Sequence, residues 1–155
     1  MGNNKFFRPD FKTLCELLNR YKVRYLVFGA WAGIIYGLPR TTLDVDIIID
    51  KTEENCQKLI ESLSNIGAGI AKELTPNEIL KTKVFMFADM IKVDIFTETY
   101  GVKNFNEVYK RSKEVNFEGI KIPVISYKDF LKTKNTDRPK DKEDLKILKK
   151  LKVKF

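Results

Sequence analysis

Three aspartates stand in stretches of sequence that otherwise predict β-strands. Asp44 and Asp46 open a segment that turns apolar and ends at Asp50, and Asp94 lies alone within the apolar run 91–96. Aspartate is disfavoured in strands, and the two-residue period of a strand puts Asp44 and Asp46 on one face, about 6.6 Å apart. Two negative charges this close repel each other unless a cation lies between them. The pattern therefore predicts a cation site, although each aspartate taken singly is also typical of a strand end or a turn.

The composition limits the chemistry that such a site could perform. The chain has no histidine, and its two cysteines, Cys15 and Cys56, have no metal-ligand spacing and are predicted to be buried thiols. Ser-His-Asp and Cys-His nucleophilic sites and histidine-containing zinc sites are therefore excluded. Oxygen-only ligands favour Mg²⁺ or Mn²⁺. A close pair of carboxylates with a third one suits two-metal phosphoryl transfer, in which a carboxylate can also take the proton of the attacking hydroxyl.

A glycine turn precedes these aspartates in the chain. Residues 28–31, Phe-Gly-Ala-Trp, join a predicted strand to a predicted helix. The small side chains of Gly29 and Ala30 would let a phosphate approach the start of that helix. Glycine after a strand is also commonplace, and Trp31 is predicted to pack against the core rather than to stack on a base.

The predicted elements that position these residues form an α+β fold, a mixed β-sheet with helices packed on it. Strands are predicted over residues 24–28, 44–50, 84–88, 91–96, 115–117 and 120–124, and the last four form two hairpins. Helices are predicted from residue 11 for about 12 residues, over 30–36, after Thr52 and Thr75, over 104–110 and 127–134, and from Pro139 onward.

Length and charge give the expected organisation. The 155 residues are predicted to form one domain, 1–155, with a basic helical C-terminal segment over about 126–155. Residues 128–155 hold 11 Lys and Arg against 5 Asp and Glu, out of a net charge of +8. This segment could bind an anionic partner such as nucleotide phosphates or a nucleic acid, or it could be a solvated helix.

The expected location is the cytoplasm. The longest uncharged stretch, 25–39, has 15 residues, whereas a membrane-spanning helix needs about 20. The polar start Met1-Gly2-Asn3-Asn4 is not a signal peptide. We therefore expect no membrane partner.

Together, these motifs resemble the nucleotidyltransferase superfamily related to DNA polymerase β. The resemblance lies in Gly29-Ala30, in the run 37–46 (Gly-Leu-Pro-Arg-Thr-Thr-Leu-Asp-Val-Asp) and in Asp94 on a later strand. Within the superfamily, the chain is similar to a small bacterial and archaeal branch that includes the nucleotidyltransferase toxins of abortive-infection systems. That branch tends to carry a final motif like Lys134 followed by 138–145 (Arg-Pro-Lys-Asp-Lys-Glu-Asp-Leu), and the resemblance covers about residues 22–148.

The resemblance implies a nucleotidyltransferase core and a role for each matched residue. Three aspartates would be catalytic and hold Mg²⁺ or Mn²⁺, namely Asp44, Asp46 and Asp94, and Asp94 would also be the general base. The triphosphate of an NTP, such as ATP, would sit at Gly29 and Ala30. Three cations would neutralise it: Arg40, Lys134 and Arg138. Ala30 departs from the usual Ser or Gly, which removes a hydroxyl contact to phosphate.

Three functions remain open at this stage. The first is metal-dependent transfer of an NMP from an NTP to a hydroxyl of a tRNA, a protein or a small molecule, with release of pyrophosphate. The second is an inactive binding module with the same fold, such as an antitoxin or a complex subunit, and an antitoxin-like protein partner is possible for the enzyme too. The third is a nucleic-acid-binding protein that uses its basic tail, with structural aspartates. An exposed loop cation at Arg40 and helix-start charge pairs among Arg138, Asp141 and Asp144 are the structural alternatives for these residues.

Overall fold

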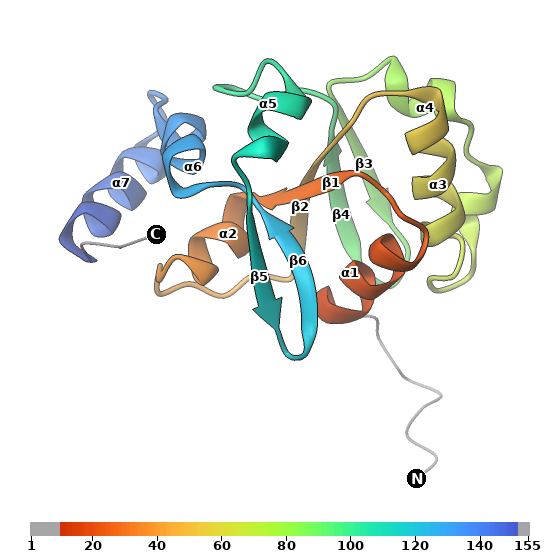
Figure 1. Ribbon diagram of the computed structural model, residues 1–155, viewed down its shortest axis with the longest axis horizontal. Coiled ribbons are helices and arrows are strands. Elements are labelled where there is room, and N and C mark those ends of the chain that lie inside the picture. Colours follow the sequence, from red (N-terminus) through yellow and green to blue (C-terminus); the bar gives the residue numbers. More distant parts are fainter. Residues whose placement is uncertain (1–9, 152–155) are drawn as a thin grey trace, which may run out of the picture.

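The computed structural model describes residues 10–151 and has an α+β fold built on one mixed sheet (Figure 1). Its strands are β1 (Tyr25–Phe28), β2 (Asp44–Ile49), β3 (Val84–Ala88), β4 (Lys92–Phe96), β5 (Lys113–Phe117) and β6 (Ile120–Val124). Its helices are α1 (Phe11–Arg20), α2 (Gly29–Ile35), α3 (Glu53–Leu63), the 3₁₀ helix η2 (Ile70–Glu73), α4 (Pro76–Leu80), α5 (Phe105–Lys110), α6 (Tyr127–Lys134) and α7 (Pro139–Leu151).

The six strands lie in the order β3-β4-β2-β1-β6-β5. The two predicted hairpins, β3-β4 and β5-β6, are confirmed as antiparallel pairs. β1 runs antiparallel to β2, while β2 is parallel to β4 and β1 is parallel to β6. This arrangement puts the aspartate-bearing strands β2 and β4 side by side, although Asp46 and Asp94 are 48 positions apart in the sequence.

Local capping explains why most predicted helix starts are confirmed. The side chains of Asp10, Thr52, Asn104 and Ser126 each accept a hydrogen bond from a backbone N–H in the first turn of the helix that follows. Such caps satisfy donors that a helix leaves free at its start. η2 was not predicted, because its four residues are too few to show a helical period.

The core lies between the sheet and its helices. β1 is buried along its whole length, as a nearly continuous apolar run predicts. Trp31 stacks on Phe11 with ring centroids 4.1 Å apart, which confirms its packing role. Cys15 and Cys56 are buried free thiols, also as predicted.

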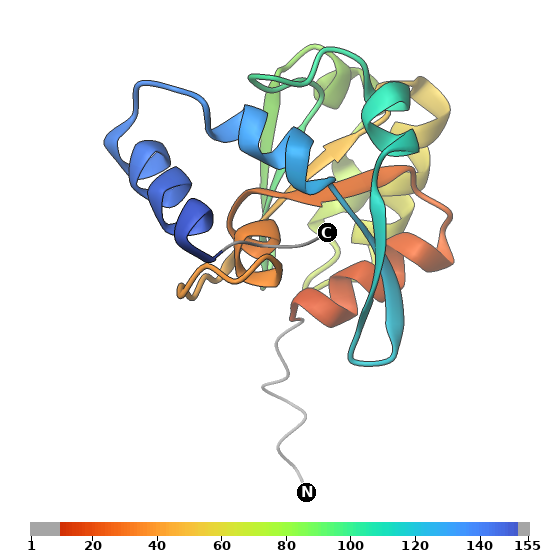
Figure 2. The ribbon, with the colours of Figure 1, turned by 60° about the vertical axis from the view of Figure 1, so that its left-hand side comes forward.

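The C-terminal helices lie at one end of the molecule, opposite α3 and α4 (Figures 1 and 2). α6 packs against α7, and α7 runs beside the loop that follows α2, where Leu151 lies near Gly37. The basic segment is therefore helical over α6 and α7, whereas its last residues, 152–155, and the polar start at Met1 lie outside the described residues. Within the described range, no helix is long and apolar enough to span a membrane.

Candidate active site

Asp46 and Asp94 are direct neighbours across the parallel strands β2 and β4. In the strand register, Asp46 pairs with Asp94 on one side and with Phe28 of β1 on the other. Neighbouring residues of paired strands point to the same face of a sheet. Both carboxylates therefore face a cleft of about 580 Å³, which we call the central cleft.

The central cleft brings together seven of the eight residues that the sequence predicted for the site. They come from the end of β1, the loop after α2, the two central strands and the α6–α7 segment: Gly29, Ala30, Arg40, Asp46, Asp94, Lys134 and Arg138. Sequence reasoning did not assign Phe96, Thr99, Tyr100 and Thr136 to this cleft, which they also line. Thr136 could have been found from its place between the two parts of the final motif, Lys134 and 138–145, whereas the other three carry no signal of their own.

The surroundings of Asp46 hold its carboxyl close to the glycine turn. A Cβ added at Gly29 would lie 2.1 Å from Asp46 Oδ2, so only glycine leaves room for this carboxyl group. Burial and the negative charge of Asp94 raise the pKa of Asp46 from 3.8 to about 6, although a hydrogen bond from the Ala30 backbone N–H acts in the opposite direction. At the turn where the sequence predicts the triphosphate, the Ala30 backbone N–H therefore has Asp46 as its hydrogen-bond partner.

Asp44 lies apart from the other two aspartates. It shares a strand face with Asp46, as predicted, but it does not line the central cleft. Its side chain is 51% exposed, and Lys92 Nζ of the neighbouring strand lies 3.9 Å from its Oδ2. Across residues 10–151, no three carboxylate or thiol side chains are gathered closely enough to hold a metal ion.

Asp46 and Asp94 nevertheless have the character of cation ligands. Asp94 Oδ1 is buried and has no hydrogen-bond partner, and an unpaired carboxylate oxygen is costly to bury. Burial of the Asp46 carboxyl and the negative charge of Asp94 beside it both raise the pKa of Asp46. A hard divalent cation would satisfy both groups with oxygen ligands, so the donor set fits Mg²⁺ or Mn²⁺.

The predicted phosphate-binding cations form ion pairs with two buried aspartates of α7. Arg40 Nη2 binds Asp144, and Lys134 Nζ lies 2.9 Å from Asp144 Oδ2 and 3.5 Å from Asp141 Oδ1. Arg138 Nε lies 2.8 Å from Asp141 Oδ2, which confirms the predicted helix-start charge pair. Arg40 is thus anchored in the cleft and is not an exposed loop cation.

Asp141 and Asp144 are each only 1% exposed, and this burial was not foreseen from the sequence. Burial raises the pKa of Asp141, but hydrogen bonds from Thr136 and Arg138 and the nearby charges of Lys134 and Arg138 outweigh it, so its pKa lies below the usual value. Both aspartates are therefore structural partners that hold cations at the cleft. A buried charge of this kind is tolerated only when it is paired and hydrogen-bonded.

Two buried polar atoms of the cleft remain without a hydrogen-bond partner. They are Asp94 Oδ1, an acceptor, and Arg40 Nε, a donor, and no other buried side-chain nitrogen or oxygen between residues 10 and 151 is left in this state. Buried polar groups in native proteins are nearly always satisfied. Both residues line the central cleft, so this cleft contains one acceptor and one donor that the described part of the protein leaves unpaired.

Comparison with known structures finds the fold that the sequence motifs predict. The chain is similar to a candidate nucleotidyltransferase from Thermotoga maritima, with a TM-score of 0.52 and 21% identity over 90% of this chain and 88% of that one. It is also similar to the lincosamide antibiotic adenylyltransferase LnuA in its lincomycin-bound form, with a TM-score of 0.57 and 21% identity over 90% of this chain and 94% of that one. No protein-family model and no curated protein sequence matches the chain. The fold is thus that of nucleotidyltransferases.

Proposed function

We propose that the protein is a nucleotidyltransferase that moves an NMP from an NTP to a hydroxyl group and releases pyrophosphate. One observation carries this proposal. Asp46 and Asp94, adjacent on parallel strands, share a cleft with the paired cations Arg40 and Lys134, and an acceptor and a donor in that cleft have no partner. The fold shared with an adenylyltransferase supports the same activity.

The metal would be held by Asp46 and Asp94, and Asp44, two residues before Asp46 on β2, would be a third ligand. Mg²⁺ or Mn²⁺ would supply neutralisation of the triphosphate charge and polarisation of the phosphoryl oxygens. The pairing of β2 with β4 places Asp46 beside Asp94 and so fixes the spacing of these two carboxylates.

The triphosphate would contact the cations of the α6–α7 segment. Lys134, Arg138 and Arg40 all line the cleft, and Arg40 Nε has no hydrogen-bond partner in the protein. Asp144 orients both Arg40 and Lys134 through its ion pairs. Gly29 and Ala30 would seat the phosphates chiefly by keeping the wall beside Asp46 free of side chains.

In the transfer step, the acceptor oxygen forms a bond to the α-phosphorus of the NTP. The bond from this phosphorus to the oxygen that bridges to the β-phosphate breaks, and pyrophosphate leaves with the electron pair. The hydroxyl proton passes to the Asp94 carboxylate, which acts as the general base. The cations of the cleft stabilise the negative charge of the leaving group.

A second candidate is a binding module of the same fold that does not transfer nucleotides. The observation that favours it is the neutralisation of Arg40, Lys134 and Arg138 by Asp141 and Asp144, which leaves the cleft less positive than its cations suggest. The two candidates differ in turnover and not in fold. An antitoxin-like protein partner and a place among abortive-infection toxins remain predictions of the sequence.

The acceptor is proposed to be a tRNA, a protein or a small molecule, and we expect the reaction to take place in the cytoplasm. The likeness to LnuA, an adenylyltransferase of lincosamide antibiotics, favours ATP as the NTP and a small hydroxylated acceptor. We treat the chain as one domain, because every strand between residues 10 and 151 joins the same sheet.

Calorimetric titration with ATP tests the proposal. We expect binding in Mg²⁺ and none in EDTA, because a triphosphate beside Asp46 and Asp94 would be repelled without a cation. Asp46→Asn in Mg²⁺ should weaken binding, while Asp137→Asn, at an exposed position outside the cleft, should leave it unchanged. Equal affinity in Mg²⁺ and EDTA would contradict the metal assignment.

A further inference from the structure

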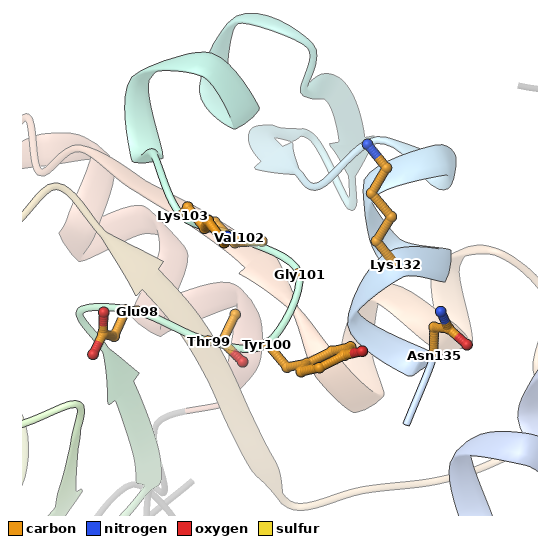
Figure 3. A pocket seen from close by; sticks show the side chains of 8 residues that line it. All are labelled: Glu98, Thr99, Tyr100, Gly101, Val102, Lys103, Lys132 and Asn135. Atoms are coloured by element: carbon orange, nitrogen blue, oxygen red, sulfur yellow. The ribbon is translucent and has the colours of Figure 1, made fainter. Parts of the chain in front are cut away.

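A second cavity adjoins the central cleft and shares two of its lining residues. It has a volume of about 560 Å³ and lies between the loop after β4 and the end of α6 (Figure 3). Thr99 and Tyr100 line both this cavity and the central cleft. The two spaces are therefore neighbours at Tyr100, and we call the second one the Tyr100 cavity.

Residues at the end of α6 line both the central cleft and the Tyr100 cavity. Thr133 and Lys134 line the central cleft, whereas Lys132 and Asn135 line the Tyr100 cavity. The same helical turn therefore places a phosphate-binding cation on one side and an amide side chain on the other. A molecule with a triphosphate at Lys134 would have its remaining part close to Asn135.

The loop after β4 is held firmly against α6. Thr99 and Val102 form an isolated β-bridge, and the Val102 N–H donates to the Thr99 carbonyl at 3.0 Å. Gly101 has φ +81°, and a Cβ there would lie 2.9 Å from the Lys132 carbonyl oxygen, so the two backbones are nearly in contact. This close approach fixes Tyr100 relative to Asn135.

Tyr100 presents a large aromatic ring that the fold does not use. Its side chain is 61% exposed, although a tyrosine of the core, such as Tyr25, is 1% exposed. Figure 3 shows the Tyr100 ring extending from the loop toward the end of α6, where Asn135 lies. An exposed aromatic ring beside an amide is the combination that recognises a nucleobase, by stacking and by hydrogen bonds to its edge.

We propose that the Tyr100 cavity is the nucleobase subsite of the protein, with Tyr100 stacking on the base and Asn135 binding its edge. The inference rests on the proposed function, which places the triphosphate in the central cleft. The Asn135 amide offers one donor group and one acceptor, so it can distinguish bases by the pattern on their edges. Lys103 and Lys132 at the cavity can only donate, so they can favour bases with acceptors on their edge but cannot bind a donor there.

The test is calorimetric titration of the full chain in Mg²⁺ with ATP, GTP, CTP, UTP and inorganic tripolyphosphate. Tripolyphosphate measures binding at the central cleft alone, because it carries no base. Tyr100→Ala should weaken NTP binding about tenfold or more, as loss of a stacked base does, and should leave tripolyphosphate binding unchanged. Tyr100→Phe, which keeps the ring, should bind NTPs like the wild type.

Asn135→Leu keeps the size of the side chain and removes its amide. We expect this variant to lose the preference that the wild type shows among the four NTPs, while tripolyphosphate binding stays the same. Equal affinity of the wild type for all four NTPs would overturn the role of Asn135.

The outcomes separate the two proposals. If the wild type binds NTPs no better than tripolyphosphate, or Tyr100→Ala binds NTPs like the wild type, the base subsite is wrong and the proposed function stands. Unchanged NTP binding with reduced turnover in Tyr100→Ala would instead indicate that the Tyr100 cavity binds the acceptor. If the wild type binds neither tripolyphosphate nor any NTP, the proposed function fails, and the base subsite fails with it.

Discussion

Gly29 lies so close to Asp46 that the carboxyl group occupies the space of a side chain at position 29. A Cβ there would approach Asp46 Oδ2 to 2.1 Å, and the backbone of Gly29 is left-handed with φ +60°. The sequence pattern predicts that this glycine allows a phosphate to approach the start of the helix. In the structure, its first role is to give Asp46 its place beside Asp94.

Gly29→Ala should therefore lower the free energy of unfolding through both strain and collision. Gly119→Ala is the matched control, because Gly119 also has positive φ, +93°, but has nothing within 4 Å of an added Cβ. Left-handed strain of about 1–2 kcal/mol affects both variants. In urea unfolding, Gly29→Ala should lower the free energy of unfolding by about 1–3 kcal/mol more than Gly119→Ala, as overpacking does. Equal losses in the two variants would mean that the Asp46 side chain moves aside at no cost.

Asp46→Asn should stabilise the metal-free protein in a pH-dependent way. The pKa of Asp46 is about 6 in the folded chain against an ordinary value of 3.8. Its protonation therefore stabilises the fold fully below about pH 4, and this contribution is lost as the pH rises through 6. In EDTA, the melting temperature of Asp46→Asn should exceed that of the wild type increasingly from pH 4 to pH 7. A difference in melting temperature that stays constant from pH 4 to pH 7 would contradict the raised pKa of Asp46.

Asp144→Asn should destabilise the fold strongly. Asp144 is buried and pairs with both Arg40 and Lys134, and removal of one partner from a buried ion pair costs about 3–5 kcal/mol. The control is Glu143→Gln, one residue away on the exposed side of α7, where changes are usually within about 0.5 kcal/mol. Urea unfolding of the two variants measures the difference, and similar values would show that Asp144 does not anchor the cations.

Asp94→Asn should separate catalysis from binding. Asparagine keeps the shape of the side chain but cannot accept a proton, so turnover should fall by about 10²–10⁴-fold. ATP affinity should change less, because Arg40, Lys134 and Arg138 keep their places. The measurements are single-turnover pyrophosphate release and calorimetric affinity. Wild-type turnover in Asp94→Asn would show that Asp94 is not the base.

The order of elements could be predicted because its signals are local. Ser126 was predicted to begin a helix, and its hydroxyl accepts from the Asp129 N–H. The turn 118–119 was predicted between two strands, and both of its residues have positive φ. Capping and tight turns involve residues only a few positions apart, so a sequence displays them directly.

The partners of the cleft residues could not be predicted, because they depend on contacts between distant segments. Arg40 and Asp144 are 104 positions apart, and nothing near either residue specifies their ion pair. Asp44 and Asp46 have the same local signal, yet the register with β4 places Asp44 opposite Lys92 and Asp46 opposite Asp94. Sequence spacing thus indicated a shared face, while strand pairing determined which aspartate faces the cleft.

The most direct test of nucleotidyl transfer is incubation of the protein with an NTP labelled at the α-phosphate, Mg²⁺ or Mn²⁺ and a cell lysate. We predict that the wild type transfers the label to an acceptor and releases unlabelled pyrophosphate, that EDTA abolishes both, and that Asp94→Asn transfers at least about 100-fold more slowly. If the wild type binds the NTP in Mg²⁺ but labels no macromolecule or small molecule and releases no more pyrophosphate than Asp94→Asn, the central cleft is a binding site and not a catalytic one.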